Sequence, residues 1–400
     1  MPSVKKQADP EEAPSSNRLL NAVIATWAER GHAAISARGL SQATGLPTSS
    51  IYHHFGSLDQ LLLEAQARAL EEAERWCARQ LDLIANAPAD APDAFPALFA
   101  ALVDDWALER RELGLAWREC HLLAARDPRY GPAIEGWRAL WPRFWEEICA
   151  RSGLPGMGVA CSHLFDGESL LHMMQWRRPV DRACLDEFAR GWGRWLGGSL
   201  APEGPWRRFA RQEALGARPL VPEPEGIAAR IAAAAADVME EGGVASLTHR
   251  AVAQRAGLTL GTIAYHYRTS ADLVRSTFEM LYSRITRRPS RGSIDPSQRA
   301  SDLQDARPLL YAMEELVVAV ARDPAYAPFI PQLRYLRGRS SGPILQSMLG
   351  TDREVSPLDA ALYSSFLAGQ GRALSGRTEE EANIVMADSA GRLIERLGTG

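Results

Sequence analysis

Small hydroxyl side chains and imidazole rings cluster in one short run near the N-terminus. Their hydroxyl and ring N–H groups are compact donors that a helix can bring close to phosphate oxygens or to the edges of bases. A solvated helix would more often carry Glu or Lys, so the pattern favours a contact surface. The other interpretation is a small helix packed in a core, for which Leu46 and Ile51 are suitably spaced. The run comprises Thr48, Ser49, Ser50, Tyr52, His53 and His54.

The same run occurs a second time in the chain. The segment GLPTSSIYHHF occupies residues 45–55, and GLTLGTIAYHY follows at 257–267, 212 positions later. Around these segments, residues 18–61 align with residues 230–273 without a gap. A self-similar sequence of this length indicates a repeated structural unit.

A second motif also recurs, in the same order. ARDPRYGP at 125–132 returns as ARDPAYAP at 321–328, with an offset of 196. Because two separate motifs return in order, we infer that the whole unit was duplicated. The smaller offset predicts that the second copy is shorter between its two motifs.

Helix signals in the first copy place the hydroxyl run on a short third helix. An amphipathic helix over 17–30 should end at Gly31, and Ser36 is a suitable N-cap for a helix over 37–43. Gly45 can adopt the positive φ that a tight turn requires. The segment PTSSIYH then forms a helix of about seven residues, and two short helices joined by a glycine turn are a helix-turn-helix. A long helix should follow.

The second copy repeats these signals. Thr248 and Thr259 occupy the two N-cap positions, and Gly257 stands at the turn. The sequence therefore predicts two helix-turn-helix units in one polypeptide.

Composition is typical of a globular chain. The 400 residues are 46% hydrophobic and 24% charged, with a net charge of −4. The chain therefore has no general attraction for polyanions, and any nucleic-acid binding must come from a local surface. No stretch approaches the ~20 apolar residues that span a bilayer, and the N-terminal tail lacks the apolar region of a signal peptide. We expect a cytoplasmic protein without membrane contact, in which the odd set of cysteines stays reduced: Cys77, Cys120, Cys149, Cys161 and Cys184.

Helical periodicity predominates, and alternating strand-like runs do not stand out. One apolar face is formed by Leu19, Val23, Ile24 and Trp27. A second face has spacings of three and four residues and comprises Trp137, Trp141, Phe144, Trp145 and Ile148. The sequence predicts an all-α fold in both halves.

Both copies resemble the DNA-binding domain of TetR-family regulators, whose usual run is Gly-Val-Ser-x-Gly-x-Leu-Tyr-x-His-Phe before a Ser-Lys-Glu-like helix start. The similarity covers residues 18–62 and 230–274. It implies double-stranded operator DNA as a partner. The implied DNA contacts in the first copy are Ser36, Arg38, Thr48, Ser49, Ser50, Tyr52, His53 and His54. In the second copy they are Thr248, Arg250, Leu260, Gly261, Thr262, Tyr265 and His266.

The chain departs from the family pattern at several positions. Pro47 replaces the usual capping Ser, so the capping role is expected to move to Thr48. Leu58 and Ser270 stand where a phosphate-contacting Lys is common, and Ala264 replaces the usual Tyr of the second copy. The third helix of each copy would read the DNA and is called the reading helix. The two reading helices differ, PTSSIYH in the first copy and TLGTIAY in the second, which predicts two unlike half-sites.

The family resemblance implies pairing as in an obligate dimer, through the last two helices of each copy. The resemblance thus implies a single-chain pseudo-dimer in which residues 157–198 pack on residues 356–396 as a four-helix bundle. Further self-association stays open. The expected organisation is a disordered tail (1–16), a first helix-turn-helix domain (17–62), a first ligand and dimerisation domain (63–200), a linker (201–226), a second helix-turn-helix domain (227–274) and a second ligand and dimerisation domain (275–400). Within the linker, one or two helical turns are expected around residues 206–215.

Aromatic residues are concentrated in the first half, where all 11 tryptophans lie at or before Trp206. The resemblance implies that the helices after each helix-turn-helix domain, called the head, enclose a small-molecule pocket. The many aromatic residues of the first half then predict a flat or aromatic effector. The other interpretation is that the tryptophans are core residues. The candidate ligand contacts are Trp117, His121, Trp137, Trp141, Phe165, His172 and Trp176.

Two functions are compatible with these patterns. The leading one is a transcriptional regulator, most simply a repressor released by an effector. The alternative is a ligand-binding or protein-interaction module with a degenerate second head, or a metal or thiol sensor using Cys120–His121, Cys161–His163 and His172. No catalytic motif is present, so we expect neither an enzyme nor a cofactor.

Overall fold

The computed structural model describes residues 14–87, 91–217, 225–287, 307–350 and 353–399. Within these ranges the chain forms helices and turns and contains no strand, which confirms the expected all-α class. The chain divides into two compact units. Unit one combines parts of residues 1–85 and 110–140, and unit two combines parts of 86–109 and 141–400.

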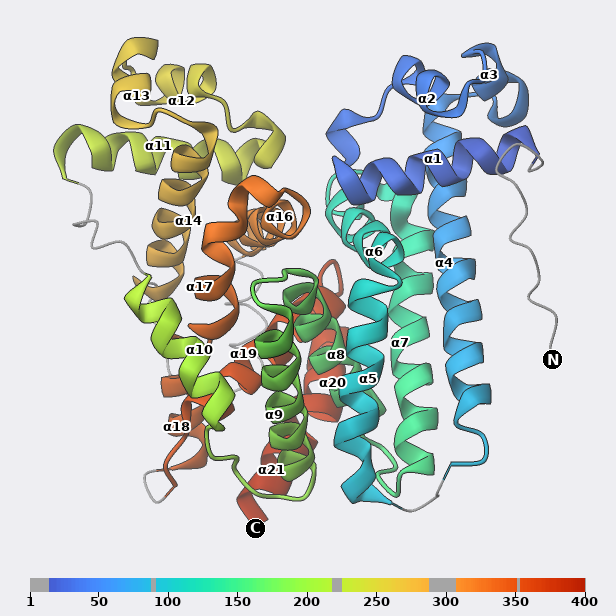
Figure 1. The fold of residues 1–400 in the computed structure, drawn as a ribbon, viewed down its shortest axis with the longest axis vertical. Helices are drawn as coiled ribbons and strands as arrows, with labels where there is room; N and C mark the ends of the chain where they lie inside the picture. The colour runs from blue at the N-terminus through green and yellow to red at the C-terminus, as the bar shows by residue number, and fades with distance from the viewer. Residues whose placement is uncertain (1–13, 88–90, 218–224, 288–306, 351–352, 400) are drawn as a thin grey trace. The chain divides into compact units, whose positions relative to one another are not determined.

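Unit one contains the first helix-turn-helix and the helices that support it (Figure 1). Its long helix α4 and the shorter α6 both pack against α1. Its elements are α1 Ser15–Glu29, α2 Ala37–Thr44, α3 Ser49–Phe55, α4 Leu58–Leu83 and α6 Arg111–Ala124, with the 3₁₀ turns His32–Ala34 and Pro128–Tyr130.

The apolar face predicted for α1 forms the core of this unit. Leu19, Val23 and Trp27 are fully buried, because they repeat at helical spacing on the side of α1 that faces α4 and α6. Burial of these side chains contributes about 1.5–3 kcal/mol each. This apolar contact packs α1 against α4 and α6.

Unit two contains the remaining helices of the first copy and the whole second copy. From the first copy it takes α5 Phe95–Leu108, α8 Gly158–Met173, α9 Arg178–Leu196 and α10 Pro205–Gly216. The second helix-turn-helix and its support are α11 Gly226–Gly242, α12 His249–Ala256, α13 Leu260–His266, α14 Ser270–Arg287 and α16 Arg307–Arg322. The rest of the copy is α17 Ile330–Tyr335, α18 Ser341–Leu349, α19 Pro357–Leu374, α20 Glu379–Met386 and α21 Arg392–Thr399.

Helix α7, Gly131–Arg151, runs from unit one into unit two and has Pro142 in its interior. In the second copy the corresponding segment is interrupted, so that α17 and α18 replace one continuous helix. The second copy has therefore diverged in the helices that follow its helix-turn-helix.

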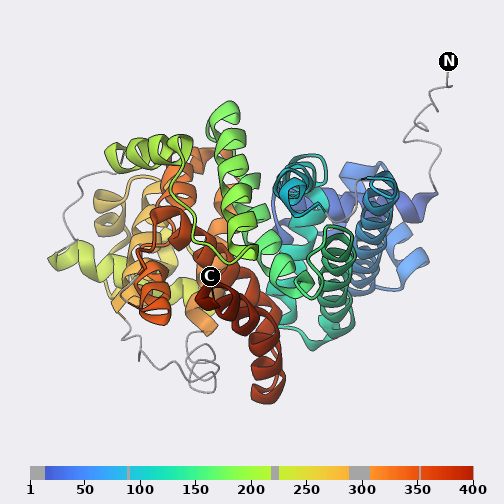
Figure 2. The same cartoon turned by 90° about the horizontal axis from the view of Figure 1, so that it is seen from below.

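A helical bundle within unit two joins the two copies. Helix α8 of the first copy packs along α19 of the second, and α9 contacts both α19 and α21. Figure 2 shows the green α9 region beside the dark-red C-terminal helices. This is the pairing of residues 157–198 with 356–396 that the resemblance implied. Between α20 and α21 the last helix passes through a π-helical turn, Ala387–Gly391.

The segment expected to be a linker contains a helix at the place where one or two helical turns were predicted, and this helix is longer and more buried than expected. Residues 205–216 form the helix α10, which packs on α9 and α17. Ala210 and Ala214 are fully buried there, beside Cys184 and Tyr335. The short alanine side chains allow this close packing, which sequence composition alone does not reveal.

No helix among the described residues is both long and apolar enough to cross a membrane.

Candidate DNA-binding interface

The first helix-turn-helix is built from the caps and the glycine turn that the sequence predicted. The Ser36 side chain accepts a hydrogen bond from the backbone N–H of Gly39 at 3.1 Å and so caps α2. Gly45 ends α2 in the left-handed region, with φ of 68°. Ile51 is fully buried and anchors α3 from below. The reading helix is thus fixed by its apolar side.

Thr48 does not take over the capping role, which corrects the expectation. It already has helical dihedrals, φ −58° and ψ −27°, and its side chain accepts no capping hydrogen bond. An N-cap side chain reaches the backbone from an extended conformation, which Thr48 lacks. Thr48 is instead an exposed residue at the start of α3.

The polar face of α3 is open to solvent. Tyr52 is 57% exposed, and the rings of His53 and His54 lie 4.9 Å apart at the end of the helix. Of the eight candidate contacts, Ser50 is half-buried, and the exposed ones are Ser36, Arg38, Thr48, Ser49, Tyr52, His53 and His54. This arrangement leaves small hydroxyls and ring donors available to an incoming ligand.

The second head has the same scaffold with a different surface. Thr248 and Thr259 cap α12 and α13 by accepting hydrogen bonds from Ala251 and Thr262, both at 3.1 Å. Ile263 is fully buried, as Ile51 is in the first head. The predicted caps are therefore confirmed in this copy.

The reading face of α13 is more apolar than that of α3. Tyr265 is 80% exposed and Leu260 is 51% exposed, while the Thr262 hydroxyl is occupied by Thr259 Oγ1 at 2.8 Å. Thr262 is half-buried, and the exposed candidates are Thr248, Arg250, Leu260, Gly261, Tyr265 and His266. The two heads therefore present unlike side chains from the same position.

The first head is also tied to its support by an ionic contact that sequence reasoning missed. Arg129, in the ARDPRY motif, forms an ion pair with Asp59 in the first turn of α4 at 2.8 Å. Its Nε and Nη2 atoms also donate hydrogen bonds to Asp127. The second copy has Ala325 at the position of Arg129. There, Glu315 of α16 instead accepts a hydrogen bond from the backbone N–H of Val244 at 2.6 Å. Each head is coupled differently to the helices behind it.

Exposed reading helices on buried apolar anchors define a helix-turn-helix DNA-binding regulator. The family description "Bacterial regulatory proteins, tetR family" matches residues 19–65 and again residues 231–277. The description "Tetracyclin repressor-like, C-terminal domain" matches residues 90–169. The chain is a tetR-family regulator with a duplicated N-terminal unit. No curated protein gives a significant match to it.

The candidate ligand residues of unit one form a compact aromatic group. Trp117, His121 and Trp137 are all buried, and the ring centroids of Trp117 and Trp137 lie 5.6 Å apart. These side chains fill the interior behind the head. Their role as ligand contacts stays a prediction.

The remaining candidates lie in unit two. Trp141 and Phe165 pack at a centroid distance of 5.1 Å, within a cluster that includes Trp106 and Trp145. Trp176 is half-buried against Tyr335 at 5.9 Å, under the guanidinium of Arg177. The sequence could not show that Trp176 meets a residue of the second copy.

His172 uses both ring nitrogens within the protein. Nε2 lies 2.7 Å from Asp104 Oδ1, and Arg334 donates to Nδ1 at 3.0 Å. Burial lowers the pKa of His172 to about 4, against the opposing effect of Asp104. Burial alone would raise the pKa of Asp104, but hydrogen bonds from His172 and Arg178 hold it well below its usual range. A neutral His172 with its proton on Nε2 fits this arrangement.

The cysteine and histidine motifs do not assemble into a metal site among the described residues, where no group of three or more potential ligands was found. The cysteine thiols are buried, and burial raises the pKa of Cys120 to about 12. Cys149 and Cys161 lie 3.4 Å apart, but burial raises the pKa of the Cys161 thiol as well. Protonated, buried thiols are poor nucleophiles, which argues against a thiol sensor at these positions.

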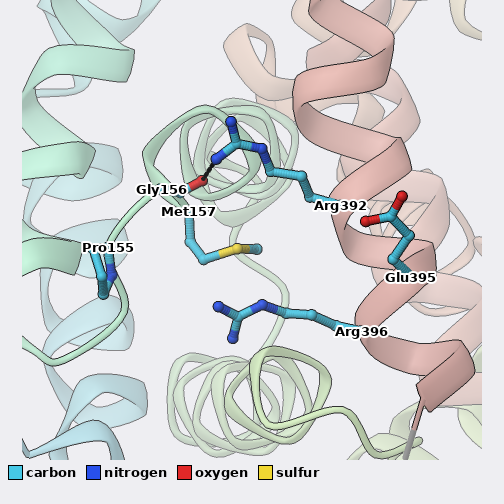
Figure 3. A pocket seen from close by; sticks show the side chains of 6 residues that line it. All are labelled: Pro155, Gly156, Met157, Arg392, Glu395 and Arg396. Atoms are coloured by element: carbon cyan, nitrogen blue, oxygen red, sulfur yellow. Dashed lines mark hydrogen bonds between the residues drawn. The ribbon is translucent and has the colours of Figure 1, made fainter.

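One pocket of about 320 Å³ lies where the start of α8 meets α21 (Figure 3). Arg392 donates to the Gly156 carbonyl at 3.2 Å and pairs with Asp388 at 2.6 Å, and Arg396 donates to the carbonyl of Leu196 at 2.8 Å. Its lining is charged rather than aromatic. It was not foreseen from the sequence, because its two walls come from opposite copies.

Proposed function

We propose that the protein is a transcriptional repressor that binds an asymmetric operator as one polypeptide and is released by a small effector. The observation that carries the proposal is the pair of unlike exposed reading faces on α3 and α13. In a homodimer, two identical reading helices recognise identical half-sites. Two different helices in one chain would recognise two different half-sites.

Covalent fusion also supports binding by a single chain. One head makes few contacts, and non-specific binding of such modules has a Kd of only ~10⁻⁴–10⁻⁶ M at physiological salt. A second head on the same polypeptide engages at a high effective concentration. The bundle of α8, α9, α19 and α21 would hold the two copies together for this purpose.

The first copy is the better candidate for effector binding. The C-terminal domain match covers residues 90–169, and five of the seven candidate contacts fall within it: Trp117, His121, Trp137, Trp141 and Phe165. His172 and Trp176 follow on the next turns, where they contact the second copy. A flat apolar effector seated among Trp117, His121 and Trp137 would change the packing within unit one, behind the first head. Release of DNA would follow from that change.

The DNA-binding part is tested by gel shift with a pool of promoter-region fragments. A double variant, Ser50→Glu with Thr262→Glu, places a carboxylate on each reading helix, and we expect binding to fall at least about 100-fold through repulsion from phosphate. The matched control is Leu83→Glu with Ile384→Glu, which adds the same charge at residues 78% and 63% exposed that belong to neither helix-turn-helix. Equal binding by both double variants would refute the proposal.

The rival function, a module with a degenerate second head, is tested by footprinting. Tyr265→Ala should weaken protection of one half-site only, and Tyr52→Ala should weaken the other. If Tyr265→Ala leaves the footprint unchanged while Tyr52→Ala abolishes it, the second head does not read DNA.

The effector part is tested by titrating aromatic small molecules into the protein–DNA complex. We expect a compound that quenches tryptophan fluorescence also to release the operator. Trp137→Leu, which introduces the residue found at Leu333 in the second copy, should weaken this release without weakening DNA binding. Release at unchanged effector concentration in this variant would remove Trp137 from the site.

A further inference from the structure

The crossing of α8 and α19 has approximate two-fold symmetry. A Cβ atom on Gly167 would lie 1.9 Å from the carbonyl oxygen of Ser365, and a Cβ on Gly369 would lie 1.9 Å from that of His163. Gly369 follows Gly167 by 202 positions, and Ser365 follows His163 by the same 202. The two contacts thus exchange their roles between copies, as in an isologous interface.

The polar contacts at this crossing do not follow the symmetry. Asp166 of α8 and Arg372 of α19 form an ion pair, and both are buried, at 7% and 6% exposure. With the same offset of 202 positions, Asp166 corresponds to Ala368 and Arg372 corresponds to Leu170. One diagonal of the crossing is ionic and the other is apolar.

The buried charges of the two helices are complementary. Helix α8 carries the buried carboxylates Asp166 and Glu168 and contains no Lys or Arg. Burial raises the pKa of Glu168, so this face already holds a carboxyl group that is costly to ionise. Helix α19 supplies the only arginine of the pair, Arg372. Two α8 helices placed together would leave the Asp166 carboxyl group of each without the Arg372 that pairs with it.

A second asymmetric contact lies at the start of α19. Asp359 is fully buried and accepts hydrogen bonds from Trp195 Nε1 at 2.7 Å and from the Ala201 N–H at 2.8 Å. At the same register the first copy holds Met157, whose thioether is a weak acceptor. Pairing of two first copies would therefore leave the Trp195 N–H without its carboxylate acceptor.

We infer that the bundle face of the first copy, formed by α8 and α9, is specific for a second copy and excludes another first copy. Its partner is a helix pair that presents a buried arginine and an N-terminal carboxylate, as α19 does. Removing one member of a buried ion pair leaves an uncompensated charge, which is strongly destabilising. Pairing of two first copies would do this at Asp166 of each, because neither copy supplies Arg372, whereas Arg372 keeps Glu314 of its own copy at 3.6 Å. This specificity goes beyond the proposed function, since it concerns which copies pair and not what they bind.

The test uses the full chain cut between the copies. A protease site is introduced between Ala217 and Glu225, and the purified protein is nicked so that both copies remain but are no longer covalently joined. Nicked protein with an affinity tag on the first copy is mixed with untagged nicked protein, unfolded in urea and refolded together. The tagged first copies are captured, and mass spectrometry counts the copies that accompany them.

For the wild-type sequence we expect that, among the copies captured with the tagged first copy, second copies outnumber untagged first copies by at least about 100-fold. The variant D166A/R372L reproduces on the ionic diagonal the Ala–Leu pair of the mirrored one, and it should lower this ratio at least tenfold. L170A is the matched control, because it truncates the apolar diagonal and leaves the charges, and its ratio should stay at the wild-type value.

Circular dichroism tests whether D166A/R372L refolds, and the uncharged polar variant D166N/R372Q serves in its place if it does not. The inference is overturned if wild-type first copies capture one another as readily as they capture second copies. It is equally overturned if the neutral variant retains the wild-type ratio.

Discussion

Arg334 of the second copy donates a hydrogen bond to Nδ1 of His172 in the first copy, at 3.0 Å. The same guanidinium donates to the Met174 carbonyl at 2.6 Å and lies 3.2 Å from Asp181. On the other side of the ring, Asp104 joins His172 to Arg178. A buried polar network thus runs through the junction of the two copies, and its central member is an imidazole held neutral by burial.

Stability should therefore decline as the pH falls below about 6.5. Burial lowers the pKa of both His172 and His163 to about 4 in the folded protein, from an ordinary value of 6.5. Between these values the unfolded chain takes up protons that the folded chain does not, and this favours unfolding. Each histidine contributes up to about 1.4 kcal/mol per pH unit. Urea unfolding at pH 7.5, 6.5, 5.5 and 5 measures the slope.

His172→Gln should reduce the dependence of the unfolding free energy on pH by about the contribution of one histidine. Glutamine can accept from Arg334 and donate to Asp104 without titrating, so the network stays connected. His54→Gln is the control, because the exposed His54 is surrounded by solvent in both states. An unchanged slope in His172→Gln would show that this histidine is not a source of the acid sensitivity.

The close crossing of α8 and α19 should depend on the absence of a side chain at Gly369. An added Cβ would lie 1.9 Å from a backbone carbonyl that cannot move aside, so we expect Gly369→Ala to cost about 3 kcal/mol or more. Gly371→Ala, two residues further along the same helix, meets nothing within 4 Å and should be neutral or stabilising. Thermal unfolding followed by circular dichroism distinguishes the two. Similar midpoints for both variants would show that the helices are not in contact at Gly369.

The buried Asp359 should be worth more than an ordinary helix cap. It accepts from Trp195 and Ala201, and together with Ser356 it forms a capping box at the start of α19. We expect Asp359→Ala to lower the unfolding free energy by about 3 kcal/mol, because the cap is lost and two buried donors are left without an acceptor. Asp359→Asn keeps one acceptor oxygen and should cost about half as much. A loss below about 1 kcal/mol in Asp359→Ala would contradict this role.

The heads could be predicted largely because their signals are local. Ser36, Thr248 and Thr259 cap helices by contacts within three residues, and the left-handed glycine turns, such as Gly45, need only their own backbone freedom. The exception is Thr48, where the expectation followed the family pattern and not the local dihedrals. Helix caps and glycine turns can be predicted from the sequence even where the tertiary structure cannot.

The junction between the copies could be predicted only as a pair of segments. The contacts of Arg372 with Asp166 and of Arg334 with His172 join residues more than 160 positions apart, and no local pattern marks them. The same holds for His172 and Trp176, whose neighbours Arg334 and Tyr335 come from a short helix of the second copy. Buried polar pairs of this kind become visible only when the fold brings their partners together.

The mass of the protein–operator complex tests the account's central claim most directly. Light scattering or native mass spectrometry on a saturated complex with the footprinted operator should give one 43.8-kDa chain per DNA duplex, protected over two half-sites of different sequence. A complex containing two chains, or one protected half-site per chain, would contradict the claim that a single polypeptide supplies both reading helices.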